Sequence, residues 1–384
     1  MTAFDVDAID LAQLRERQSA KYRQYPPDVI PAWVAEMDFP LAEPIAAALH
    51  AAIDRSDTGY RSTEGLAEAT ADFLEMSWQW SVPQDRIVAI PDVLTGVAES
   101  IAMLTEPGEG VVVNPPVYPP FFSTIRDIVG RSIVEVPMSE LDGAYSLDLT
   151  GLADAFARPE VTAFLLCSPH NPTGTVPSQA ELEEVARLAA EHDVAVIADE
   201  IHAPLTLPGA RHVPYLTVAA PDARAICVIA ASKAWNLAGL KCAQMIGTDE
   251  TEGIIRRRLP LEVQYGTGHL GVIASVAAYR DGGPWLEQVL GILDANRMLL
   301  ADLLAEHLPE AGYVPPEASY LAWIDLPGWG DDPAVAILRE ARVALNRGPT
   351  FGPGGRGHVR LNLATSPAIL TEIVGRLGRL TPGT

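Results

Sequence analysis

The amino-acid sequence predicts an α/β fold with two domains, a large one built on a mostly parallel sheet and a smaller α+β one. Its 384 residues, 48% of them hydrophobic, are enough to bury two cores. From about residue 85, short apolar runs alternate with loops and helical patterns, which is typical of parallel strands joined by helices. Near residue 282 this alternation gives way to one long amphipathic helix. We therefore expect an N-terminal arm at 1–45 that joins the small domain, a large domain at 46–284 and a small domain at 285–384.

The arm is predicted from a short helical pattern and a proline-interrupted stretch. The helical pattern covers 9–17, and the stretch after it ends in the sequence Trp33-Val-Ala-Glu-Met-Asp-Phe39. A second helical pattern, rich in alanine, covers 44–53 and leads into the large domain. The sequence Thr58-Gly-Tyr-Arg61 then indicates a turn that exposes Tyr60.

The large domain is predicted from five apolar runs that end in polar residues. A helix begins near Asp92 after the first run and extends to about Leu104, and another begins at Ser178. Ser178 and Glu181 have the spacing of a capping box, in which each side chain bonds the other residue's backbone N–H. The runs interpreted as strands are 86–90, 110–113, 163–167, 194–198 and the stretch from 226 to 232.

The small domain is predicted from the residues after 284. Leucine and valine recur at near-helical spacing from 285 to about 307, which indicates a long helix linking the two domains. Strands at 320–326 and 357–363 are separated by a helical pattern at 333–344, and a last helix follows. In the second strand, side chains alternate between the two faces, so Arg360 points away from the face that its apolar neighbours Val359 and Leu361 share. This favours a specific role for its guanidinium over simple surface exposure.

Composition narrows the possible partners. The formal net charge of −23 argues against a nucleic acid or an anionic membrane, because both need basic patches. No stretch has the roughly eighteen apolar residues of a membrane span, and the acidic N-terminus does not resemble a signal peptide. The expected location is therefore cytoplasmic. Cys167, Cys227 and Cys242 show neither a disulfide framework nor a zinc spacing, so we expect packing roles and no metal.

Lysine is used sparingly, and this draws attention to Lys233. The 27 basic residues include only three lysines, Lys21, Lys233 and Lys241. A guanidinium is effectively never deprotonated, whereas a buried ammonium can lose its proton and become a nucleophilic amine. Lys233 follows the apolar run that begins at Ile226, so we expect it at the end of a buried strand.

The predicted strand ends together carry the groups that bind pyridoxal 5′-phosphate. Ligands of open α/β sheets bind beyond the carboxyl ends of the strands. There, Lys233 would condense with the aldehyde of the cofactor, and Asp199 would keep its pyridine nitrogen protonated. Tyr118 would stack on the ring, and Asn171 would donate to the phenolate oxygen. The phosphate would be held by the helix start at Val93 and Leu94 and by Lys241. Ser232, next to Lys233, is also assigned to the cofactor site.

The order of these motifs resembles a known family. The sequence Asn171-Pro-Thr-Gly174, then Asp199, then Ser232-Lys233 with Lys241 eight positions on, is similar to fold-type I pyridoxal-phosphate enzymes of the aspartate aminotransferase superfamily. Within that superfamily the chain is identified as a member of the cystathionine β-lyase branch of MalY/PatB type. The resemblance extends over nearly the whole chain and rests on six stretches: 19–22, 33–39, 166–174, 199–202, 320–323 and 359–362.

The resemblance implies further site residues. Arg360 would bind the substrate α-carboxylate, and Tyr60 would reach the cofactor phosphate of a neighbouring subunit in a homodimer. His202 stands where related aminotransferases commonly have tyrosine, and it matches the lyase branch. The sequence supports two roles for His202 equally: direct contact with the cofactor, or support of another residue that makes that contact. Ala230 departs from the serine that many relatives have there as a phosphate ligand.

For three positions, the sequence does not distinguish packing of the arm from contact with the substrate. Trp33 is assigned to the substrate site, although packing of the arm explains it equally well. The same two alternatives remain for Lys21 and Asn346.

The resemblance implies a pyridoxal-phosphate-dependent C–S β-lyase. It would convert amino acids with a sulfur leaving group, such as cystathionine or cysteine conjugates, into a thiol, pyruvate and ammonia. Lys233 would remove the Cα proton as general base. The first alternative is a class I/II aminotransferase, which shares every step up to removal of that proton. A more remote alternative is a regulatory protein of this fold that binds another protein, for which an intact Lys233 would be superfluous.

Overall fold

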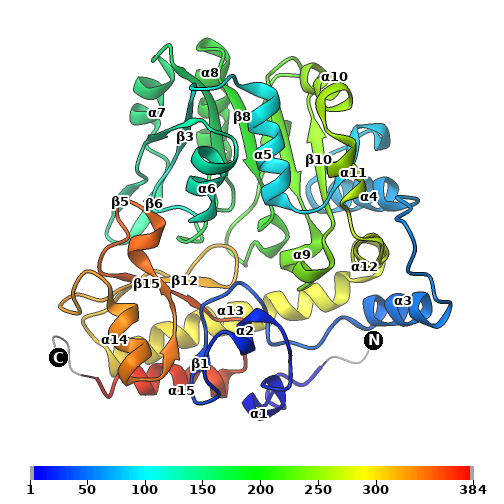
Figure 1. The fold of residues 1–384 in the computed structure, drawn as a ribbon. Coiled ribbons are helices and arrows are strands. Elements are labelled where there is room, and N and C mark those ends of the chain that lie inside the picture. Colours follow the sequence, from blue (N-terminus) through cyan, green and yellow to red (C-terminus); the bar gives the residue numbers. More distant parts are fainter. Residues whose placement is uncertain (1–3, 381–384) are drawn as a thin grey trace.

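The computed structural model describes residues 4–380, and its largest element is a seven-stranded sheet (Figure 1). The central strand pairs are parallel, and only β10 is antiparallel to its two neighbours within this sheet. The prediction of a mostly parallel α/β sheet is therefore confirmed. In spatial order the strands are β2 (Ile87–Ile90), β10 (Ala243–Gly247), β9 (Ala225–Ile229), β8 (Ala195–Asp199), β7 (Val161–Cys167), β3 (Gly110–Val113) and β4 (Ser132–Glu135).

Helices cover both faces of this sheet, which explains why its strands are continuous apolar runs. Within β9, Ile226 and Val228 pack on the face covered by α5 (Val93–Leu104) and α10 (Asp249–Arg258). Cys227 belongs to the core on the opposite face. That face is covered by α4 (Leu66–Trp78), α7 (Leu149–Phe156) and α8 (Gln179–Glu191). A strand buried on both faces has no polar side to show, so its sequence does not alternate.

The second sheet has four antiparallel strands and lies beside the long helix α13 (Gly283–His307) (Figure 1). The length of α13 agrees with the helix predicted from 285 to about 307. The strands in spatial order are β11 (Gly312–Tyr313), β12 (Leu321–Asp325), β15 (His358–Asn362) and β14 (Asn346–Arg347). Helices α14 (Pro333–Glu340) and α15 (Pro367–Leu377) share one apolar core with these strands.

The arm packs on the second sheet. It contains α1 (Leu11–Leu14), α2 (Ala20–Arg23) and β1 (Ile30–Pro31). Strand β1 pairs in parallel with β13 (Val343–Ala344). One apolar core joins Leu14 and Ile30 of the arm to the second sheet, and it also includes α12 (His269–Asp281). The domain boundaries at 45 and 284 therefore stay a prediction.

Three predicted elements differ in the structure. The helix predicted at 9–17 is a single turn, α1. The helix predicted at 333–344 ends at Glu340, because Arg342 has a positive φ of 55° and the next two residues pair with β1. The strand predicted to continue to Ser232 ends at Ile229, so Lys233 lies on the short helix α9 (Ala231–Ala234).

Several elements were not anticipated from the sequence. They include α4, α7, α10, α12, β4, β10, α11 (Leu261–Tyr265), α6 (Pro120–Ser123) and the hairpin of β5 (Ser139–Leu141) with β6 (Ala144–Ser146). In contrast, α3 (Glu43–Asp54) matches the helical pattern at 44–53. Within residues 4–380, no helix has the length and apolar character needed to cross a membrane.

Candidate active site

A cavity of about 180 Å³ opens at the carboxyl edge of the large sheet. It lies where β2, β7 and β8 end and where α9 follows β9. Every cofactor position predicted from the sequence contributes to its wall, with the exception of Tyr60. The predicted residues that line it are Val93, Leu94, Tyr118, Asn171, Asp199, His202, Ser232, Lys233 and Lys241.

Lys233 presents its amine to this cavity from α9. Its Nζ donates a hydrogen bond to the carbonyl oxygen of Ala35 at 3.1 Å. Burial lowers the pKa of Lys233 to about 8, and the nearby charge of Arg360 acts in the same direction. Asp199 and Glu36 oppose that shift. A substantial fraction of the amine is therefore neutral near physiological pH, as a nucleophile or a general base requires.

Asp199 ends β8 and is 4% exposed. Its Oδ1 accepts a hydrogen bond from the backbone N–H of Ile201 at 3.1 Å. Burial raises the pKa of Asp199 to about 7, although the Ile201 N–H and Lys233 favour the charged form. A cationic nitrogen placed beside this carboxyl would favour its ionised form further.

His202 is buried in the wall of the cavity and is held from behind. Its Nδ1 is 3.0 Å from the hydroxyl oxygen of Ser319. Burial lowers the pKa of His202 to about 3, and the charges of Lys233 and Arg360 reinforce the effect, so the ring is neutral. Its position in the wall is compatible with direct contact with the cofactor. Its bond to Ser319 is compatible with a supporting role behind the cofactor, so both interpretations remain predictions.

The start of α5 offers backbone donors to an anion. Asp92 caps the helix, since its Oδ1 accepts from the N–H of Thr95 at 2.9 Å. Its Oδ2 accepts from Nζ of Lys241 at 2.9 Å. The first N–H groups of a helix have no acceptor within it, so those of Val93 and Leu94 can bind a phosphate. Ala230 is buried at the end of β9 and adds no hydroxyl here.

Two tyrosines predicted to meet the cofactor have different surroundings. Tyr118 lines the cavity, where burial raises the pKa of its hydroxyl, and its ring packs edge-on against Phe121. Tyr60 is fully exposed between α3 and α4. The structure describes one chain, so a contact of Tyr60 with a neighbouring subunit stays a prediction.

Arg360 is a buried cation whose hydrogen-bond partners are all neutral. Its Nη1 donates to Oδ1 of Asn171 at 2.8 Å, and its Nη2 donates to the carbonyl oxygen of Trp33 at 3.2 Å. The amide oxygen of Asn346 also accepts from Nη2. Burial lowers the pKa of Arg360 to about 10, which leaves it positive at neutral pH. No carboxylate forms an ion pair with Arg360 within residues 4–380, and a substrate carboxylate would supply the missing negative charge.

Three contributors had no assigned role from the sequence. Ala35 contributes its backbone carbonyl, which also accepts from the hydroxyl of Tyr320 at 3.1 Å. Asn346, for which packing and substrate contact were left open, orients Arg360. Ala35 and Tyr320 lie inside stretches that carried the family resemblance. Their role depends on a backbone atom and on contacts between segments far apart in the chain, which no residue pattern reveals.

The residues present fit pyridoxal 5′-phosphate. The cavity combines an amine of lowered pKa, a buried carboxyl, an aromatic wall and a helix start beside Lys241. Each matches one chemical group of the cofactor: aldehyde, ring nitrogen, ring face and phosphate. Over residues 4–380, no group of three or more histidine, cysteine, aspartate or glutamate side chains has an arrangement that could hold a metal ion.

Comparison with known proteins places the chain in a family. The model of the family "Aminotransferase class I and II" matches residues 28–377. The chain belongs to this family. A putative cystathionine beta-lyase of Mycobacterium leprae is 45% identical over 99% of this chain and 98% of its own length. Cystathionine beta-lyase PatB of Bacillus subtilis is 35% identical over 91% of this chain and 92% of its own.

A solved structure agrees with this class I and II aminotransferase fold. The crystal structure of a putative PLP-dependent beta-cystathionase from Corynebacterium diphtheriae matches with a TM-score of 0.91 at 33% identity. The match covers 99% of this chain and 98% of that one. The resemblance to fold-type I enzymes of the cystathionine β-lyase branch, predicted from the sequence, is therefore confirmed.

Proposed function

We propose that this protein is a pyridoxal-phosphate-dependent C–S β-lyase that releases a thiol, pyruvate and ammonia from sulfur-containing amino acids. The observation that carries the proposal is the cavity in which Lys233, Asp199 and the anion-binding start of α5 meet. Relatives between 35% and 45% identical that are named cystathionine beta-lyase support the choice of reaction.

The charge and pKa of each residue indicate its role in the reaction. When bound, pyridoxal phosphate supplies an aldehyde that bonds to amines and a ring that withdraws electrons from Cα. Asp199 would keep the ring nitrogen of the bound cofactor protonated, which would strengthen that withdrawal. Lys233 removes the Cα proton, since its lowered pKa leaves it partly neutral. Arg360 binds the α-carboxylate and so orients the Cα–H bond toward Lys233.

A class I/II aminotransferase is the second candidate. The family model that matches the chain carries that name, and the same residues serve both reactions up to removal of the Cα proton. The reactions then differ in whether the β-substituent leaves or a proton returns to the cofactor carbon.

The deciding experiment mixes the cofactor-loaded protein with L-cystathionine, in the absence of any 2-oxo acid, and follows pyruvate. We expect pyruvate to accumulate over many turnovers in the native protein and not in Lys233→Ala. A reaction that stops after one turnover and resumes when a 2-oxo acid is added would identify an aminotransferase instead.

The assembly and the location belong to the proposal as well. A homodimer is supported by large apolar side chains that are exposed in the single chain, in addition to Tyr60. They are Ile53, Met76, Leu261 and Tyr265. Sedimentation of the native protein should give twice the mass of the chain, and a monomer would contradict the contribution of Tyr60 to a neighbouring site. The cytoplasmic location stays a prediction that fractionation of cells can test.

A further inference from the structure

Residues 33–38, called here the linking segment, contact two site residues at once. The carbonyl oxygen of Ala35 accepts from Nζ of Lys233 at 3.1 Å. Two residues earlier, the carbonyl oxygen of Trp33 accepts from Nη2 of Arg360 at 3.2 Å. The same short backbone therefore bonds both the amine and the guanidinium, although 127 positions separate Lys233 from Arg360 in the chain. A displacement of the linking segment would change the surroundings of both groups.

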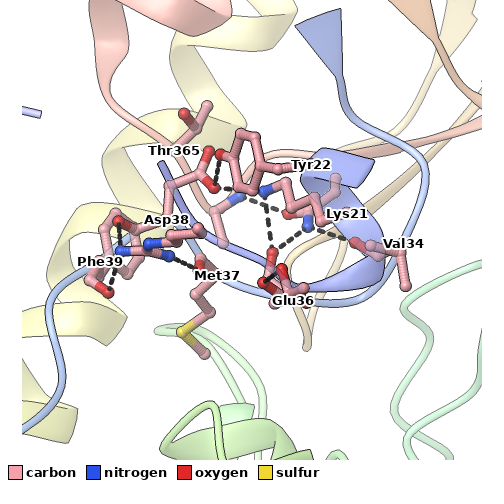
Figure 2. A network of polar contacts seen from close by, with 12 residues as sticks. Lys21, Tyr22, Val34, Glu36, Met37, Asp38, Phe39 and Thr365 are labelled. Carbon is pink, nitrogen blue, oxygen red and sulfur yellow. Dashed lines mark hydrogen bonds and ion pairs between the residues drawn. The ribbon is translucent and has the colours of Figure 1, made fainter. Parts of the chain in front are cut away.

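The linking segment is held from the arm by a buried ion pair. Nζ of Lys21 lies 2.6 Å from Oδ1 of Asp38, and the two residues are 2% and 4% exposed. The same Nζ donates to the carbonyl oxygen of Glu36 at 3.0 Å. The hydroxyl of Tyr22 donates to the same oxygen of Asp38 (Figure 2). Lys21 thus binds the linking segment at two points, through a side chain and through the backbone.

The choice of lysine at this position is informative. Only three of the 27 basic residues are lysines, and a charged group is costly to bury unless it is paired and hydrogen-bonded. Apolar residues would pack the arm at least as well, so packing alone does not explain an ammonium here. An ammonium does offer several donors from one atom. At Lys21 these donors reach Asp38 and Glu36, which lie next to the part of the segment that contacts the site.

We propose that Lys21 and Asp38 are positioning residues, whose buried ion pair fixes the linking segment so that the carbonyls of Ala35 and Trp33 hold Lys233 and Arg360. The role rests on the proposed function, because it concerns the amine that reacts with the cofactor. Neither Lys21 nor Asp38 lines the cavity, and they act through the backbone of the linking segment. The arm is thereby part of the site and not only a packing element.

The test measures how the full-length chain, freed of cofactor, takes up pyridoxal phosphate at different pH values. The neutral amine is the reacting form, so the midpoint of the pH profile reports the pKa of Lys233. The charged groups that act on Lys233 are Arg360, Asp199 and Glu36. A hydrogen bond to the protonated amine favours that form. We therefore expect Lys21→Met, which displaces the Ala35 carbonyl, to move the midpoint down by about half a pH unit.

Two further variants separate positioning from stability. In Lys21→Met/Asp38→Leu no carboxylate is left unpaired, so folding should be retained, but methionine cannot donate to the carbonyl of Glu36. This double variant should still show the lowered midpoint. Arg23→Met is the matched control, because it removes an exposed basic side chain from the same helix, α2, whose bond goes to the carbonyl of Glu16 and not to the linking segment. It should keep the native midpoint.

Each outcome has one meaning. A native midpoint in the folded double variant, or an equal shift in Arg23→Met, would overturn the positioning role. If Lys21→Met does not fold, the double variant alone decides. A native chain that takes up no pyridoxal phosphate would instead overturn the proposed function.

Discussion

The two edges of the large sheet both carry hollows, but only one has the chemistry of an active site. The hollow at the amino edge has a volume of about 560 Å³, against about 180 Å³ for the cavity at the carboxyl edge. The larger hollow is rich in charge, with Arg158, Arg224 and Arg258 in its wall. Size and charge alone would therefore select the wrong edge.

The difference lies in how the polar groups are partnered. At the amino edge, Arg258 donates to the carbonyl of Met103 at 2.6 Å, and Arg224 donates to that of Leu104 at 2.7 Å. These guanidiniums bond the free carbonyls at the C-terminal end of α5. At the carboxyl edge, burial shifts the pKa of Lys233 down and that of Asp199 up. Burial with incomplete pairing, rather than volume, marks the place where a ligand is needed.

The largest effect is expected from removing the amine at the carboxyl edge. Lys233→Ala deletes both the nucleophile and the base, so kcat/KM should fall by about 10³-fold or more. Pyruvate release from L-cystathionine measures it. The matched change at the amino edge, Arg224→Ala, should leave kcat/KM within about twofold. A comparable loss in both variants would remove the distinction between the edges.

Arg360→Ala should have the next largest effect. A charge-assisted hydrogen bond contributes about 1.5–3 kcal/mol, which corresponds to a roughly ten- to 150-fold loss of kcat/KM. Arg360→Lys should recover only part of the loss, because an ammonium cannot form the paired contact of a guanidinium. Unchanged kcat/KM in Arg360→Ala would refute carboxylate binding by this residue.

The pH dependence of cofactor uptake tests whether the pKa of Lys233 at the carboxyl edge is lowered. Burial lowers the pKa of Lys233 to about 8. The fraction of the amine that is neutral therefore increases about tenfold per pH unit below 8 and levels off above it. Uptake of pyridoxal phosphate by the native chain, followed by absorbance, should show that profile. A rate that still rises steeply at pH 9 would mean that the amine keeps an ordinary pKa.

The smallest effect is expected from Arg158→Ala in the wall of the amino-edge hollow. The substitution should change kcat/KM by less than about twofold, as is usual for residues away from a site. A steady-state measurement with L-cystathionine suffices. A large loss would show that the amino edge takes part in function.

Most residues predicted to meet the cofactor line the cavity, because they lie at or soon after the ends of apolar runs. Asp199 ends the buried strand β8, and Asn171 lies soon after the buried strand β7, so their arrival at one sheet edge follows from the parallel topology. The sequence failed where tertiary pairing decides the local structure. Strand β10 contains Gln244 and no β-branched residue before Ile246, so its sequence is a weak strand pattern.

The links between distant segments were also beyond prediction. The bonds of Arg360 to Asn171 and Trp33 join residues 189 and 327 positions apart. The carbonyl of Ala35 has no signature at all, because every residue has one. The helix predicted to reach Ala344 stops at Glu340 owing to a pairing with β1, which hydrophobic periodicity does not encode.

The rarity of lysine allows a direct test of which residue binds the cofactor. Borohydride reduction of the loaded protein fixes pyridoxal phosphate to the lysine that binds it, and peptide mapping then identifies one of three candidates. We predict a single label on Lys233. A label on Lys21, or no label, would contradict the assignment of the carboxyl-edge cavity as the active site. A label on Lys241, which lines the same cavity, would contradict the role of Lys233.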